Sequence, residues 1–192
     1  MSTANAMACK LVAECIHGVV ADFSHCNLKK EFTEEVQQRY LVHAHKDLKT
    51  IDISNNFMDF PSVATLFHMQ LHLEIVVADF LQMDIQNLKN FEFILELILK
   101  SGAHYISLQN NKFQYEQAKI VFSFLLSHPA TLSHIKVLDL RENLFDVSHL
   151  RLATLIHLIQ KNSPNLKLLL PTYKFTNTEK IKYKLPKCLR FF

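Results

Sequence analysis

The 192-residue chain contains only two glycines and five prolines. So little glycine and proline argues against long flexible linkers and low-complexity arms. Two glycines also cannot build a P-loop or a dinucleotide-binding glycine loop, and no Gly-x-Ser-x-Gly pentapeptide occurs. The sequence therefore gives no support to nucleotide chemistry or serine hydrolysis, and its length predicts one domain with a sizeable core.

The sequence also lacks a basic start followed by a long apolar run, and no apolar stretch reaches about 18 residues. We therefore expect no cleaved signal peptide and no membrane span. None of the four cysteines has Cys-x-x-Cys spacing, so we interpret them as small buried apolar residues in a reducing compartment. These features predict an intracellular, cytoplasmic location. The cysteines are Cys9, Cys15, Cys26 and Cys188.

The 11 histidines raise the question of a metal site. His68 and His72 lie four residues apart, and His43 lies close to His45, but neither pair has the acidic residue and third ligand of zinc motifs. A nucleophilic pair of Cys26 with a nearby histidine is an alternative that no neighbouring residue favours. We therefore predict no metal, no cofactor, no small-molecule substrate and no enzymatic activity.

Residues 135–145 carry the most informative motif, Ile-Lys-Val-Leu-Asp-Leu-Arg-Glu-Asn-Leu-Phe. Apolar residues stand at places one, four, six and eleven, and asparagine stands at place nine. Places four and six lie two apart, so a short strand points both side chains into a core. The asparagine amide can satisfy backbone groups where the strand ends.

The motif recurs with intervals of 30, 25, 30, 32 and 31 residues, which leave room for a helix on each return leg. The third copy lacks asparagine, and in the sixth Pro171 falls near place six, where it would interrupt a strand. We expect Asn56, Asn111 and Asn143 to be structural, forming a hydrogen-bonded ladder. The copies start at residues 18, 48, 73, 103, 135 and 166.

Residues 18–175 thus resemble the leucine-rich-repeat superfamily, and the long repeats resemble its ribonuclease-inhibitor-like subclass. The resemblance implies an α/β fold: a curved right-handed horseshoe solenoid of about six repeats, with a parallel sheet on the concave face and helices on the convex face. Lys-, Asn- and Phe-rich composition and small size are similar to leucine-rich-repeat effectors that intracellular bacterial pathogens inject into host cells. The resemblance to these effectors implies a repeat protein that binds other proteins and acts in host–pathogen interaction and virulence.

The predicted single domain has three parts, a helical N-terminal cap at 1–17, repeats at 18–175 and a basic C-terminal cap or tail at 176–192. Helices are expected around 33–43 and 61–70. The clearest helical pattern starts at Leu88 and ends by Gly102, and another stops before Pro129. A last helix is predicted to bury Leu150, Ala153, Ile156 and Ile159.

Places three, five and seven alternate with the core positions, so they are predicted to face the concave side. An apolar row at place three would then lie beside carboxylates at place five, which suits a partner protein with basic residues. The competing interpretation is that these aspartates only solvate the surface. The candidate partner-binding residues are Asp52, Ile75, Val77, Asp79, Tyr105, Gln109, Val137, Asp139 and Arg141.

The segment from Lys174 to Phe192 carries six basic residues against one acid, Glu179. Its formal charge of +5 leaves 15 basic and 17 acidic residues, or −2, for the rest of the chain. The segment would suit a cap over the last repeat with its lysines solvated. The alternative function is a basic-tail module that binds nucleic acid or anionic membrane.

Overall fold

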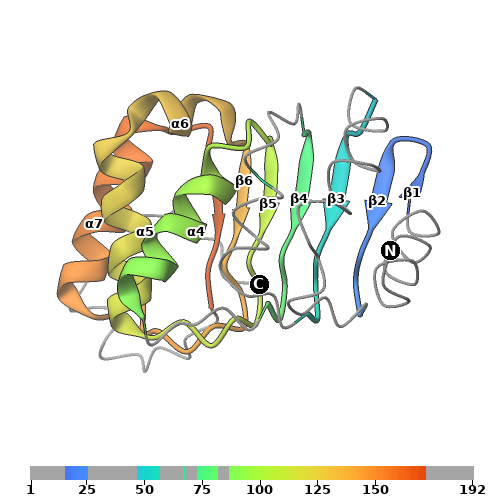
Figure 1. The fold of residues 1–192 in the computed structure, drawn as a ribbon. Coiled ribbons are helices and arrows are strands. Elements are labelled where there is room, and N and C mark those ends of the chain that lie inside the picture. The colour runs from blue at the N-terminus through green and yellow to red at the C-terminus, as the bar shows by residue number, and fades with distance from the viewer. Residues whose placement is uncertain (1–15, 26–46, 57–66, 68–72, 82–86, 172–192) are drawn as a thin grey trace.

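The computed structural model describes residues 16–25, 47–56, 67, 73–81 and 87–171. Within them, seven strands form one sheet whose spatial order follows the chain, as Figure 1 shows. The first pair is antiparallel, and every later pair is parallel. The predicted α/β class with a parallel sheet is confirmed. The strands are β1 (Ile16–His17), β2 (Val20–Asp22), β3 (Thr50–Asp52), β4 (Ile75–Val77), β5 (Tyr105–Ser107), β6 (Val137–Asp139) and β7 (Lys167–Leu169).

β1 and β2 form a hairpin at the start of the sheet, with Ile16 paired to Ala21. Gly18 opens the two-residue turn with φ +60°, a conformation that L side chains rarely adopt. The predicted helical cap at 1–17 is therefore wrong at its last two residues, which form a strand because this turn folds them back onto β2. The rest of that cap lies outside the described residues, as do most of the helices expected at 33–43 and 61–70.

The strand register places equivalent residues of the motif side by side. Ile51, Val76, Ile106 and Leu138 occupy place four on four adjacent strands, and each is fully buried. This alignment matches the first five predicted repeat starts. Because parallel strands in register stack the same motif places, the apolar places form continuous rows across the sheet.

The sixth repeat start is wrong by one residue. Val137 at place three pairs with Lys167, so the last copy begins at residue 165 instead of 166. Leu168 and Leu170 then take places four and six, and both are buried. The pattern could not fix this register because residues 168–170 are three consecutive leucines. Pro171 falls at place seven, after β7, and interrupts no strand.

The helices α4 (Leu88–Leu99), α5 (Tyr115–Ser127), α6 (Pro129–His134) and α7 (Leu150–Asn162) lie beside the β5–β6 end of the sheet in Figure 1. The Asn87 side chain accepts the Asn90 N–H and so caps the start of α4. Gly102, at φ +83°, follows its end as predicted.

Two helix predictions need correction. Leu150, predicted to be buried, is exposed at the start of α7, and Leu152 takes its place on the buried face with Ile156 and Ile159. Spacings of four and three residues keep these three side chains on one stripe. α6 was not predicted, because Pro129 indicates a helix end; a proline is equally compatible with the first turn of a new helix.

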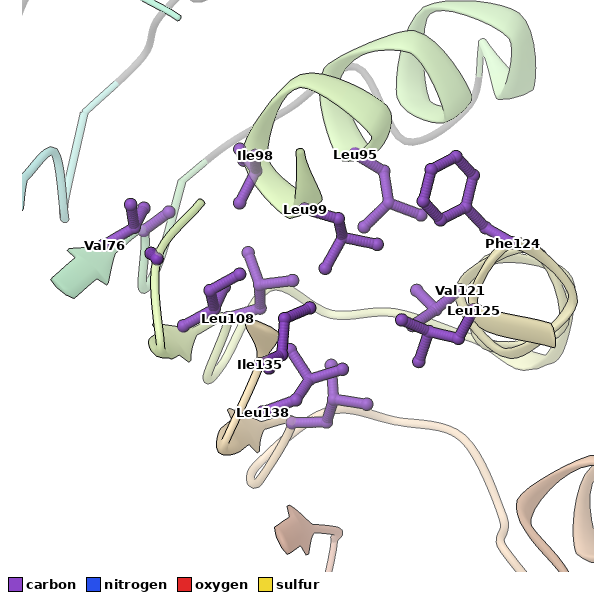
Figure 2. Close-up of a cluster of buried hydrophobic side chains, with 14 of the residues drawn as sticks. Val76, Leu95, Ile98, Leu99, Leu108, Val121, Phe124, Leu125, Ile135 and Leu138 are labelled. Atoms are coloured by element: carbon purple, nitrogen blue, oxygen red, sulfur yellow. The ribbon is translucent and has the colours of Figure 1, made fainter. Parts of the chain in front are cut away.

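The core lies between the helices and one face of the sheet. Figure 2 shows Leu95, Ile98 and Leu99 of α4, and Val121 and Leu125 of α5, pointing into the same apolar space as Leu108 and Leu138. These side chains belong to one continuous buried cluster. Phe91 and Phe113 meet edge to face with ring centroids 5.1 Å apart. Each return helix thus covers the apolar places of the strands next to it.

Leu138→Ala should lower the free energy of unfolding by about 2–5 kcal/mol, because it opens a cavity at a fully buried place. Urea unfolding followed by circular dichroism measures this change. Leu144→Ala is the matched control, because Leu144 is 65% exposed and its truncation should cost no more than about 0.5 kcal/mol. Equal losses from the two substitutions would contradict the described packing.

Candidate interaction surface

The sheet face opposite the helices carries the residues at places three, five and seven, because places four and six point into the core. We call it the acidic face, since it bears four aspartates. All nine residues predicted to bind a partner lie on it, across β3 to β6 and the turns that follow them. The face comprises Val20, Asp22, Ser24, Thr50, Asp52, Ser54, Ile75, Val77, Asp79, Tyr105, Ser107, Gln109, Val137, Asp139, Arg141, Lys167 and Leu169.

The predicted apolar row at place three is continuous. Successive strand pairs align Val20, Thr50, Ile75, Tyr105 and Val137, and Lys167 extends the row onto β7. Val20 and Ile75 are 36% and 37% exposed, which leaves apolar surface open to a ligand. Tyr105 and Val137 are partly buried. The row thus offers aliphatic and aromatic contacts along the strand-pairing direction.

The aspartates at place five close the ends of their own strands. Asp52 Oδ1 accepts the Ser54 N–H at 2.8 Å, and Asp139 Oδ1 accepts the Arg141 N–H at 3.1 Å. Asp22 does the same for Ser24 at 2.9 Å. Where neighbouring strands pair, residues at places six and eight donate their N–H groups to backbone carbonyls of the next unit, such as Ile53 N–H to Val77 and Asn55 N–H to Asp79. The residue at place seven makes no such backbone hydrogen bond. The carboxylate therefore satisfies the one N–H that the strand end leaves over.

Three strands, β4, β5 and β7, lack an aspartate at place five, and in the first two a side chain of the preceding unit accepts the place-seven N–H instead. Asp79 Oδ1 accepts the Gln109 N–H at 2.8 Å and the Ser107 hydroxyl at 2.5 Å. Ser54 Oγ in turn accepts the Asp79 N–H at 3.2 Å. On the last strand, place seven is Pro171, which has no N–H to satisfy. Every place-seven N–H of the six described parallel strands is thus either bonded or absent.

Asp79 lies in a disfavoured environment for a negative charge. Burial raises the pKa of its carboxyl, and the negative charges of Asp139 and Asp52 raise it further. The hydrogen bonds from Ser107 and Gln109 oppose this increase. The pKa of Tyr105 is also raised, first by burial and then by Asp139 and Asp79. The centre of the face therefore favours a positively charged ligand group.

Asp139 is already neutralised by Arg141. The guanidinium Nε lies 3.0 and 3.2 Å from the two carboxylate oxygens, and Nη2 lies 2.7 Å from Oδ2. The carboxylate is fully buried, whereas the Arg141 side chain is 41% exposed. The hydrogen bond to Asp139 raises the pKa of Arg141. Asp139 and Arg141 were both predicted to bind a partner, but only the outer edge of the Arg141 guanidinium is open to a ligand.

The asparagine ladder is confirmed as structural. Asn143 Nδ2 donates to the carbonyls of Leu108 and Leu140, both at 2.9 Å, and its Oδ1 accepts the N–H groups of Asn111 and Phe113. Asn56 and Asn111 likewise donate to carbonyls of the preceding strand end. These amides are buried, so they hold neighbouring turns together and do not face a ligand.

Sequence reasoning missed two features of this surface. Ser54 and Ser107 act in the hydrogen bonds between strand ends, which only the strand register could reveal. In the five copies whose place eight the structure describes, this residue adopts a positive φ, even where it is the bulky Phe80. The asparagines at place eight were a usable signal, because asparagine tolerates this conformation. The place-eight residues are His25, Asn55, Phe80, Asn110 and Glu142.

The part of the chain that the structure describes contains no group of three or more His, Cys, Asp or Glu side chains able to hold a metal ion. His43, His45, His68, His72 and the four cysteines lie outside that part. Among the described helices, none has the length and apolar character needed to cross a bilayer. Compared with known proteins, the chain matches no family model and no curated protein.

Asp79→Asn should leave the fold at least as stable as the wild type at pH 7, because the amide oxygen can still accept both hydrogen bonds while the disfavoured charge is gone. The pKa of Asp79 is raised on folding, so its ionisation costs stability at neutral pH and its protonation removes that cost. The advantage of the variant should therefore shrink as pH falls from 7 toward 3.8, the ordinary value. Urea unfolding at several pH values measures it.

Glu92→Gln, on the exposed side of α4, is the matched control for loss of one carboxylate. An advantage of Asp79→Asn that grows as the solution is acidified would contradict the described environment of Asp79.

Proposed function

We propose that the chain is a leucine-rich-repeat solenoid of the ribonuclease-inhibitor-like type. Three observations support this proposal: six parallel strands in chain order, strand starts 30, 25, 30, 32 and 30 residues apart, and buried asparagines that bond to the preceding turn. Each unit buries its apolar places only against its neighbours, which is the packing that repeat proteins use. The acidic face corresponds to the concave face of such a solenoid.

We further propose that the chain is a non-catalytic module that binds a partner protein through the acidic face. The observation that carries this proposal is the in-register row from Val20 to Val137, apolar except for Thr50, which runs beside carboxylates across five strands. Apolar contacts beside complementary charge give an interface both affinity and orientation. The composition supports a more specific proposal, an effector that acts on a host protein inside the host cell.

The partner should be basic on the side that meets the face. Asp52 and Asp79 form no salt bridge with any described residue, whereas Asp139 is paired with Arg141. A lysine or arginine of the partner can pair with Asp52 or Asp79 while an apolar neighbour covers Ile75. The second candidate, binding of nucleic acid or anionic membrane by the basic tail, rests on the charge of 174–192, outside the described residues.

A double variant, Ile75→Ala with Asp52→Asn, tests the protein-binding proposal. Both positions are at least partly exposed, and asparagine can still accept the Ser54 N–H, so the fold should persist. Capture from a eukaryotic lysate with the wild-type chain identifies the partner. Its affinity for the double variant should then be about tenfold or more lower, because one apolar anchor and one charge are lost.

The matched control is Leu158→Ala with Glu92→Gln, on helix surfaces away from the face. Leu158 is 39% exposed, close to the value for Ile75, so the two variants remove similar apolar surface and one charge each. The control should bind the partner as the wild type does. Equal affinity of the partner for the wild type and the Ile75→Ala, Asp52→Asn variant would contradict the proposal.

A further inference from the structure

The β6–β7 end of the acidic face carries buried side chains. Leu169 stands at place five on β7, at the edge of the parallel strands, yet it is only 8% exposed. Asp139 beside it is fully buried. The described helices pack on the opposite side of the sheet, against the core places.

The charge of the face selects its occupant. Asp22, Asp52, Asp79 and Asp139 stand on it against Arg141 and Lys167, and Arg141 is committed to Asp139. Burial and mutual repulsion both disfavour the charge of Asp79. The segment 174–192 carries six basic residues and one acid. Opposite charge of this size favours contact between the two at low ionic strength.

The segment is also joined to the chain at the right place. It follows Pro171, which comes shortly after β7, at one end of the face. Parallel strands lie about 4.8 Å apart, so β3 is roughly 19 Å from β7. The nine residues from Pro171 to Lys180 can span about 30 Å when extended. Lysines from Lys180 onward can therefore reach Asp79 and Asp52.

We propose that residues 174–192 bind to the acidic face of their own chain, with lysines near Asp52 and Asp79 and apolar side chains against the place-three row. Leu185, Phe191 and Phe192 supply the apolar groups, and Ile75, 37% exposed, lies on the same strand as Val77, the register partner of Asp52. The contact belongs to the isolated chain and does not depend on the proposed function. A partner that uses the same face has to displace the segment first.

The first test is zero-length cross-linking of the full chain with a carbodiimide, which joins only carboxylates and amines in direct contact. The monomer is isolated by gel filtration and its cross-linked peptides are mapped by mass spectrometry. Links from Lys180, Lys182, Lys184 or Lys187 to Asp52 or Asp79 are expected, with loss of these links at high salt. Tail links that go equally to Glu92 and Glu116 on the helices, or a monomer without links from the tail lysines to Asp52 or Asp79, would overturn the proposal.

The second test does not depend on reactive carboxylates. Acylation of amines by a water-soluble reagent should be slow at the tail lysines of the wild type and faster in Asp52→Asn with Asp79→Asn, whose amides can keep the strand-end hydrogen bonds. Glu92→Gln with Glu116→Gln is the control and should label as the wild type does. Equal labelling of the tail lysines in all three proteins would overturn the proposal. Both the cross-linking and the labelling results concern the isolated chain, so they stay the same if the acidic face proves to bind no partner protein. The proposal for the tail and the proposed function can therefore fail separately.

Discussion

A strand of three residues cannot stand alone, and this constraint explains most of the molecule. Such a strand, together with the residue that follows it, buries two apolar side chains, at places four and six, and leaves N–H and C=O groups open on both edges. Each described parallel strand meets both needs through its neighbours, with the motif places aligned from β2 to β7. The constraint extends into the turns, where Asn143 bonds to the carbonyl of Leu108 on the preceding strand end. Stability is therefore shared between neighbours.

The same constraint gives the aspartates two roles. Asp52 and Asp139 satisfy the place-seven N–H of their own strands, and Asp79 satisfies that of the next strand. The strand-end hydrogen bond explains an aspartate in such a turn without any ligand. For this reason the sequence left two interpretations of these aspartates open, solvation of the surface and binding of a partner. The structure separates the three: Asp139 is paired with Arg141, whereas Asp52 and Asp79 retain charge without a salt bridge to a described residue. Only the latter two are open to a basic group.

The sequence predicted what depends on local periodicity and missed what depends on register. The pattern around Leu138 placed it on a strand beside Ile106, because a two-residue period and a buried asparagine are local signals. The last repeat start failed, because residues 168–170 offer apolar side chains in either register. The same limit applies to Asp79, whose role is set by Ser107 and Gln109 on the next strand, about thirty residues away. The nine candidate residues were placed on one face, but which of their charges stay open was not predictable from spacing.

The most direct test of the account is amide hydrogen exchange of Gln109, measured by NMR in the native state. This N–H donates to the carboxylate of Asp79, which follows the preceding strand, so its exchange reports whether neighbouring units complete one another. We expect slow exchange, comparable to that of the Leu108 N–H, which donates to the Asp139 carbonyl, and a marked acceleration at Gln109 alone in Asp79→Ala. Exchange of Gln109 as fast as that of an unstructured peptide amide in the wild type would contradict this expectation.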